Sequence, residues 1–230
     1  EPELVKQAFV DVPKWPEKVW LDGEKESLGL YLTGHPINQY LGEIKHYSPT
    51  RLVDLKPTHK DQTSYAVGLV LSVRVMTNKR GKRWALVTLD DKSARIDVRF
   101  FPEMYEQYES MLLADKILVI SGQVSFDEFS GGNTMQARDA MDIVQAREKN
   151  AKAVQIQLES SWCNPASLAK LQTILKPYQG GSCPVLVRYR HPDAEANLAF
   201  GAQWYISPED ELLYDLQQYL GATQVELVFH

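Results

Sequence analysis

Cysteine is scarce in this sequence, and long apolar runs are missing from it. The two cysteines, Cys163 and Cys183, lie outside any CxxC pair and have no partner histidines nearby in the sequence. We expect free thiols in a reducing cytoplasm rather than a disulfide or a zinc site. No stretch reaches the roughly 18 apolar residues that a membrane-spanning helix needs, so we expect no such helix and no membrane partner.

The first residues lack the features of a leader peptide. The start EPELVKQAFVDV has neither a basic beginning nor an apolar centre, and it therefore predicts no signal peptide. It also lacks an initiator methionine, so we expect the chain to be a fragment of a longer protein.

Sequence motifs of catalysis are missing as well. There is no glycine-rich phosphate loop, no Ser/His/Asp grouping and no metal-ligand spacing. The adjacent acids Asp90 and Asp91 fall at a predicted turn between strands, whereas metal-assisted nucleotidyl transfer needs acids that converge on ions about 3.5–4 Å apart. We therefore expect this chain to be neither an enzyme by itself nor a cofactor-binding protein.

The composition is that of a folded protein. Of the 230 residues, 44% are hydrophobic, which is enough for packed cores, and the length allows one or two domains. The net charge is −5. Its uneven distribution along the chain is informative about function.

Alternating apolar residues and turn signals between Tyr65 and Ile143 predict five strands. Pro102 stands where a helix begins, so a helix follows the third strand. Three strands, a helix and two more strands is the order of the OB-fold, a small barrel whose strand 2–3 face and loops bind oligonucleotides. Other five-stranded barrels exist, and this order favours the OB-fold. The strands are expected at residues 65–75, 84–89, 95–101, 116–129 and 134–143, with a bulge at Gly122.

Positive charge is concentrated in the first part of this barrel. Residues 65–101 carry eight basic and three acidic side chains, a net +5 that leaves −10 for the remainder. Such a patch suits a phosphate backbone, and aromatic rings beside it can stack on bases. The alternative is a solvated strand face, with Trp84 closing one end of the barrel. The predicted nucleic-acid-binding residues are Arg74, Lys79, Arg80, Lys82, Arg83, Trp84, Arg95, Arg99 and Phe101.

The C-terminal part predicts a small α+β domain, with helices on one face of a short sheet. Helices are expected to open at Asn164-Pro165 and Ser207-Pro208. Residues 153–230 carry four basic and eight acidic side chains, and this charge of −4 favours a protein partner over DNA. Strands are expected at residues 153–158, 184–190, 198–200, 203–206 and 224–229. The predicted partner-binding residues are Trp162, Tyr178, Leu213, Tyr214 and Gln217, while Trp204 and Tyr219 are expected in the core.

A short helical segment is expected ahead of the barrel. Helices are predicted from Glu24 to Gly34 and again from Pro36, and Trp15 and Trp20 are expected to anchor an extended stretch before them. The complete prediction is an N-terminal linker and helical segment (1–60), an all-β OB-fold barrel (61–145) and a small α+β domain (146–230).

Long phrases of the sequence resemble those of one known family. The segment KESLGLYLTGHPINQYLGEIKHY (25–47) is similar to the stretch that precedes the OB domain in bacterial DNA polymerase III alpha subunits. The similarity continues through residues 88–101, 117–132 and 141–148, and through residues 198–229 near the C-terminus. It covers essentially the whole chain.

This resemblance implies a function for each domain. The barrel would bind the single-stranded DNA template, and the C-terminal domain would bind tau, a subunit of the clamp loader. The sliding clamp would be bound only through a motif upstream of this chain. The Mg²⁺ that the parent polymerase uses would be held by carboxylates that also lie upstream.

Two other interpretations remain open. In the first, both domains are protein-docking modules, and the basic face of the barrel contacts another polymerase domain or subunit. In the second, the barrel is an anticodon-binding domain attached to an enzyme, which fits the fold but finds no support in the flanking sequence.

Overall fold

The computed structural model describes residues 15, 17–59, 61–128 and 131–229. The chain divides into two compact units, one up to Gln39 and one from Tyr40 onward. In the first unit, helix α1 (Glu17–Leu28) is followed by the 3-10 turn η1 (Pro36–Tyr40).

The prediction for this first segment is wrong about the bounds of the helix, which ends at Leu28 rather than at Gly34, and about the two tryptophans. Helix α1 begins at Glu17, seven residues before the predicted start at Glu24. Trp15 and Trp20, which were predicted to be anchors, are 68% and 50% exposed. Instead of belonging to an extended stretch, Trp20 lies in the helix and donates a hydrogen bond from Nε1 to Glu24 one turn later, at 2.8 Å.

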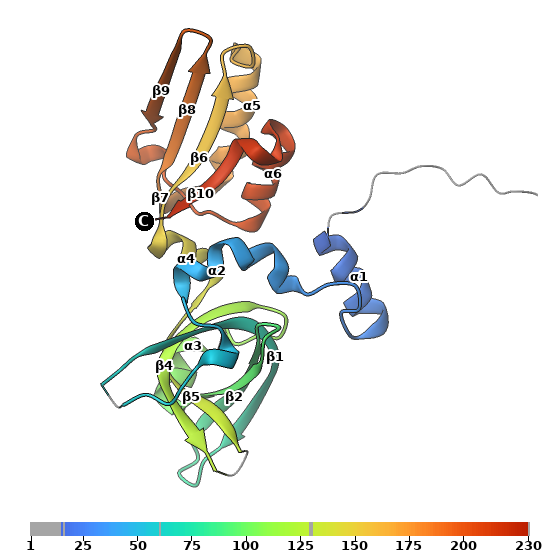
Figure 1. Cartoon of the computed structure of the whole chain (residues 1–230), viewed down its shortest axis with the longest axis vertical. Coiled ribbons are helices and arrows are strands. Elements are labelled where there is room, and N and C mark those ends of the chain that lie inside the picture. The colour runs from blue at the N-terminus through green and yellow to red at the C-terminus, as the bar shows by residue number, and fades with distance from the viewer. Residues whose placement is uncertain (1–14, 16, 60, 129–130, 230) are drawn as a thin grey trace, which may run out of the picture. The chain divides into compact units, whose positions relative to one another are not determined.

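A closed five-stranded barrel forms the first part of the second unit (Figure 1). The strands follow one another around it in the order β1-β2-β3-β5-β4; β3 and β5 run parallel, and the other neighbours are antiparallel. Helix α3 (Pro102–Tyr108) lies between β3 and β4 in the chain, so the predicted OB-fold order is confirmed. The strands are β1 (Ser64–Thr77), β2 (Arg83–Asp90), β3 (Arg95–Phe100), β4 (Ile117–Asp127) and β5 (Gly132–Asp142).

Apolar side chains at alternate positions along the strands point inward and fill the interior of the barrel. In β2, Ala85, Val87 and Leu89 are fully buried, while the residues between them are part-exposed. The predicted irregularity in β4 is present, because the β4–β5 register shifts between Ser121 and Gly122. A Cβ atom at Gly122 would lie 2.2 Å from the carbonyl oxygen of Gln136, so only glycine allows the two strands to approach this closely.

The C-terminal part contains a four-stranded sheet in the order β10-β6-β8-β9. Helices α5 and α6 pack on it, and Leu171, Leu175, Leu212 and Leu216 belong to its buried core. The sheet and helices expected for residues 146–230 are therefore present. The elements are β6 (Ala151–Glu159), α5 (Pro165–Leu175), η3 (Lys176–Tyr178), β7 (Gln179–Cys183), β8 (Val185–His191), β9 (Ala194–Ala199), η4 (Ala202–Trp204), α6 (Asp210–Leu220), η5 (Ala222–Gln224) and β10 (Val225–Phe229).

Two strands in this domain were placed wrongly. The residues from 194 to 199 pair with β8 as strand β9, and residues 203–206 form no regular strand. A two-residue turn after His191 fixes this register, because His191 pairs with Ala194. Strand β9 (AEANLA) is exposed at every position, and its alternation consists mainly of small alanines, which is a weaker signal than the large apolar residues of the buried strands.

A buried ion pair connects the helix that precedes the barrel in the sequence with the helix that follows it. Helix α2 (Leu41–Tyr47) precedes the barrel, and α4 (Ile143–Asn150) follows it. Arg147 of α4 donates from Nε and Nη2 to the two carboxylate oxygens of Glu43 in α2, at 2.8 and 2.7 Å. Its Nη1 lies 2.8 Å from Asp210 Oδ1 and donates to the carbonyl oxygen of Pro208 at 2.9 Å.

Two tyrosines complete this cluster, which we call the Arg147 junction. Tyr40 donates its hydroxyl hydrogen to Asp210 at 2.6 Å, and Tyr47 donates to Glu43 at 2.7 Å. Burial, and then the adjacent carboxylate, raises the pKa of each phenol, so both remain donors. Burial alone would lower the pKa of Arg147, but Glu43 and Asp210 raise it above its usual value.

Aromatic packing connects the last strand to the same helix. The ring of Phe229 in β10 stacks on His46 of α2, with centroids 4.1 Å apart and an interplanar angle of 7°. It also meets the edge of Tyr47 at 5.8 Å. Helix α2 is therefore held by the ion pair with α4 and by ring contacts from β10, while Asp210 of α6 accepts a hydrogen bond from Tyr40, the residue before α2.

We predict that Arg147→Ala lowers the free energy of unfolding by about 3–5 kcal/mol, because it leaves Glu43 buried without its cation. Urea denaturation followed by circular dichroism measures this change. Lys149→Ala is the matched control: it removes an exposed cation from the same helix and should change stability by less than about 0.5 kcal/mol. Equal effects of the two substitutions would contradict a structural role for the junction.

Candidate nucleic-acid interface

The outward side chains of β1, β2 and β3 form one continuous surface, which we call the outer face. Side chains alternate along each strand, and cross-strand partners point to the same side of the sheet. The pairing registers therefore arrange the outer face in four rows. In order from the β1–β2 turn, they are Met76, Trp84 and Phe101; Arg74, Leu86 and Arg99; Ser72, Thr88 and Asp97; and Asp90 with Arg95.

Aromatic and basic residues occupy the two rows nearest the β1–β2 turn. The rings of Trp84 and Phe101 have centroids 6.2 Å apart, and Phe101 is 42% exposed. Arg74, in the next row, is exposed, and no described residue forms an ion pair with it. This end of the outer face combines apolar rings with an available cation.

A compact turn presents three cations beside the aromatic row. Oδ1 of Asn78 accepts hydrogen bonds from the backbone N–H groups of Arg80 and Lys82, at 2.9 and 3.0 Å. Gly81 adopts a positive φ of 76°, which permits the tight turn. Lys79, Arg80 and Lys82, hereafter the basic loop, are exposed, and within the described part of the chain they form no ion pairs.

The other three predicted arginines already have acidic partners. Arg95 contacts Asp90 at 2.9 Å, and Arg99 contacts Asp127 at 2.6 Å. Arg83 directly precedes Trp84 in β2, so its side chain points to the other side of the strand. There it contacts Glu109 at 3.0 Å. The structure thus brings eight of the nine predicted residues to the outer face or its basic loop, while Arg83 faces elsewhere.

Arg83 also bonds to the helix after β3. Its Nη2 donates to the hydroxyl of Tyr105 at 2.9 Å, and that hydroxyl donates to Glu109 at 2.7 Å. Sequence analysis missed this group, although α3 places Tyr105 and Glu109 one turn apart, the spacing at which side chains on a helix meet.

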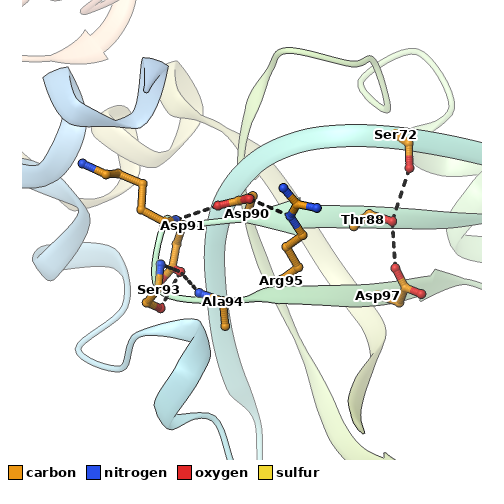
Figure 2. A network of polar contacts seen from close by, with 9 residues as sticks. Ser72, Thr88, Asp90, Asp91, Ser93, Ala94, Arg95 and Asp97 are labelled. Carbon is orange, nitrogen blue, oxygen red and sulfur yellow. Dashed lines mark hydrogen bonds and ion pairs between the residues drawn. The ribbon is translucent and has the colours of Figure 1, made fainter. Parts of the chain in front are cut away.

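Polar side chains cross the middle of the outer face (Figure 2). Thr88 donates from Oγ1 to Oδ1 of Asp97 at 2.7 Å, and the hydroxyl of Ser72 donates to Thr88 at 3.3 Å. These bonds link β1, β2 and β3 through their side chains. They mark the limit of the aromatic and basic part of the face.

The turn between β2 and β3 is organised by Asp91. Its Oδ1 accepts hydrogen bonds from the N–H groups of Ser93 and Ala94, at 2.8 and 3.1 Å, and from the Ser93 hydroxyl (Figure 2). Its Oδ2 accepts from the N–H of Leu52, which opens the 3-10 turn η2 (Leu52–Asp54). The predicted turn is present, and it also holds the segment before the barrel.

The hydrogen bonds of Asp91 stabilise its charged form. Burial alone would raise the pKa of this carboxyl, but the bonds from Ser93, Leu52 and Ala94 outweigh it and lower the pKa below its usual value. A lowered pKa means that the stabilisation is present above the unfolded-state pKa and is lost as the pH falls through the folded-state pKa.

We predict that Asp91→Asn destabilises the protein at pH 7 by about 1–3 kcal/mol, and that the difference from the unsubstituted protein shrinks as the pH falls below about 4. Thermal unfolding across a pH series measures this. Asp61→Asn, at an exposed loop position, is the control and should leave stability nearly unchanged. A difference that is constant with pH would contradict this role of the Asp91 charge.

The predicted partner-binding residues are divided between the core and the surface. Trp162 packs edge-on against Tyr219 with centroids 5.5 Å apart, and Leu213 packs on the core of the second sheet. Tyr214 is 44% exposed, and Gln217 follows it one turn along α6. These outward residues form a candidate contact surface, which we call the α6 face.

Acidic residues lie beside Tyr178. Burial first, and then the charges of Asp215, Glu209 and Glu211, raises the pKa of the Tyr178 hydroxyl. Tyr178 itself packs, part-buried, against the core of this domain, whereas Glu211 and Asp215 are exposed on α6. The α6 face is negatively charged as well as aromatic.

A groove in the same domain was not foreseen from the sequence. It has a volume of about 570 Å³ and lies between α5 and the segment from Ala199 to Trp204. Leu168, Phe200 and Trp204 are among its lining residues, none of which is charged. Trp204, expected in the core, is only part-buried there.

Within the described residues, no group of three or more histidine, cysteine, aspartate or glutamate side chains is arranged to hold a metal ion. In the same residues, no helix combines the length and apolar character required to cross a membrane.

Comparison with known proteins first defines the class. Residues 66–143, which cover nearly the whole barrel, match the family model described as an OB-fold nucleic acid binding domain. Residues 170–221 match the model described as DNA polymerase III subunit alpha, C-terminal domain.

Relatives extend this match over the full chain. DNA polymerase III subunit alpha of Vibrio cholerae is 48% identical and that of Escherichia coli K12 is 49% identical, each over 100% of this chain. The chain belongs to the DNA polymerase III subunit alpha family and corresponds to its C-terminal region. It spans 20% of the length of these two relatives.

Solved structures include a domain of replication protein A from Methanococcus maripaludis. It is 15% identical, with a TM-score of 0.33, and the match covers 41% of this chain and 93% of that one. A score this low carries no argument about function.

Proposed function

We propose that the barrel binds single-stranded DNA through its outer face. The observation that carries this proposal is the aromatic row beside the basic loop, because bases stack on such rings while cations hold the phosphates. Stacking on an aromatic side chain contributes about 1–3 kcal/mol per base, whichever base is bound. Binding to the outer face should thus tolerate many sequences.

The available cations set how binding responds to salt. Arg74 and the basic loop supply four positive charges without ion-pair partners among the described residues. Arg95 and Arg99 contribute less, since acidic neighbours already offset their charge. Each phosphate neutralised on a single strand contributes a slope of about −0.7 to the plot of log affinity against log salt.

We predict that replacing Lys79, Arg80 and Lys82 together by alanine weakens binding of a mixed-sequence single strand by about tenfold or more at low salt. The salt slope should become shallower by about 2, since three contacts of roughly 0.7 each are lost. Fluorescence anisotropy over a salt series measures both quantities.

The control for this variant replaces Lys45, Lys149 and Lys152, three exposed lysines outside the barrel strands. The net charge changes equally, so a general effect of charge would weaken binding in both variants. Equal weakening would contradict a binding role for the basic loop.

One observation supports a second candidate function for the barrel. Three of the predicted arginines are already engaged by acids, which lowers the positive potential of the barrel. If the unsubstituted protein shows no affinity for single-stranded DNA at low salt, the barrel is better described as a protein-docking module that contacts another polymerase domain or subunit.

We propose that the C-terminal domain binds the tau subunit of the clamp loader through the α6 face. Exposed Tyr214 offers an aromatic anchor, and the exposed Glu211 and Asp215 of the same helix supply a negative field; tyrosine is prominent among residues that dominate interface energies. A positively charged segment of the partner would suit this face. The groove beside Leu168 is uncharged and would suit an apolar segment instead.

We predict that Tyr214→Ala combined with Gln217→Ala weakens tau binding by about tenfold or more, and that affinity falls as salt rises, because the α6 face is acidic. Surface plasmon resonance at several salt concentrations measures both effects. Leu168→Asp, which places a charge in the groove, should leave tau affinity unchanged.

Point substitutions are preferable to truncation in this test. Removal of residues 207–230 would delete the core residues Leu212 and Leu216 together with an edge strand of the sheet. Salt-independent tau binding that is lost only in Leu168→Asp would move the contact to the groove and contradict the assignment to the α6 face.

We infer that this region positions DNA and a partner protein in the cytoplasm, and that it does not catalyse nucleotidyl transfer. The polymerase activity, its Mg²⁺ ions and the contact with the sliding clamp are assigned to other parts of the whole alpha subunit. In support, the chain spans about a fifth of its relatives.

A further inference from the structure

The middle of the outer face carries a carboxylate that takes no part in the proposed base stacking or phosphate binding. Asp97 stands in the third row, and its Oδ1 accepts a hydrogen bond from Thr88 at 2.7 Å (Figure 2). Within the described residues, no group hydrogen-bonds its other oxygen, Oδ2. The side chain is part-exposed, so a ligand on the outer face can reach it.

Neighbouring arginines leave this carboxylate available. Arg95 and Arg99 flank Asp97 on the same side of β3, but they bond to Asp90 and Asp127. Thr88 fixes the carboxylate, and Ser72 in turn contacts Thr88 (Figure 2). Asp97 is therefore an oriented hydrogen-bond acceptor with one unused oxygen.

The rows place this acceptor where the edge of a base would lie. Residues two apart on a strand are separated by about 7 Å, so the third row is about 13 Å from the row of Trp84. The basic loop and Arg74 attract phosphates at the opposite end, and a carboxylate repels them from the third row. A base stacked on Trp84 does not itself reach this far, so the base whose edge meets Asp97 is that of a nucleotide further along the same strand.

A fixed carboxylate selects among bases by their donors. Cytosine, adenine and guanine carry an exocyclic amino group that donates to it, as in carboxylate contacts to the N4 amino group of cytosine. Thymine has no such group, and carbonyl oxygens flank its one ring N–H. The carboxylate of Asp97 would face one or both of these oxygens.

We propose that Asp97 is a specificity-determining residue of the outer face, which it biases toward bases with an exocyclic amino group and against thymine. The proposal rests on the proposed binding of single-stranded DNA. Thr88 is its positioning residue, since its hydroxyl directs Oδ1 and leaves Oδ2 toward the ligand. The bias is a modest preference superimposed on binding that otherwise tolerates sequence.

The test compares oligo-dC with oligo-dT, two pyrimidine strands of equal length and charge. Anisotropy with the full 230-residue chain should show oligo-dC bound about fivefold or more tightly than oligo-dT, the lower end of what a good base contact contributes. Asp97→Asn should bring the two affinities to within about twofold, because an amide also donates to carbonyl oxygens.

Two further variants separate a specific effect from a general one. Asp193→Asn makes the same change in charge on the turn between β8 and β9, and it should preserve the ratio of the oligo-dC affinity to the oligo-dT affinity. Thr88→Val keeps the shape of the side chain but removes the hydroxyl, and it should reduce the ratio without abolishing binding. Ratios are compared between variants with intact thermal transitions, and Thr88→Val supplies the test if Asp97→Asn does not fold.

The outcomes distinguish this proposal from the one on which it rests. Binding of both strands without preference, or a ratio unchanged in Asp97→Asn and in Thr88→Val, would overturn the role of Asp97 and leave single-strand binding intact. Absence of binding to either strand at low salt would overturn both proposals.

Discussion

A buried arginine determines how the second unit of this chain holds together. Arg147 has three directions in which its planar guanidinium donates, and each is met, by Glu43, Asp210 or the carbonyl oxygen of Pro208. Two carboxylates around one cation leave an excess negative charge, and the hydroxyl groups of Tyr40 and Tyr47 offset part of it by hydrogen bonding. These groups come from segments far apart in sequence, so the charges are satisfied only when α2, α4 and the beginning of α6 are brought together.

Sequence patterns predicted those parts of the fold that depend on local chemistry. The barrel strands alternate between buried and exposed side chains, Pro102 begins a helix, and Gly122 coincides with a close approach of two strands. Strand β9 was misplaced, because its alternation consists mainly of small alanines on an exposed edge strand and is a weak signal. The start of helix α1 was also predicted too late, at Glu24, whereas the helix begins at Glu17.

Only part of the outer face could be predicted from the sequence. The sequence identifies cations and rings, and the strand registers gather most of them on one surface. Ion pairing is not visible in a linear count of charge, because Asp127 and Glu109, the partners of Arg99 and Arg83, lie outside the basic segment. Asp97 was counted only as an acid that reduces the charge of the patch, whereas its bond to Thr88 makes it an oriented group.

The ring contact between Phe229 and His46 has a mechanical consequence. Phe229 ends the last strand, β10, and it stacks on the helix that leads into the barrel. A force applied to β10 is therefore shared between its pairing with β6 in the sheet and the ring contact with α2. The stacked rings give a load on β10 a second route, beside the sheet, to the helix that precedes the barrel.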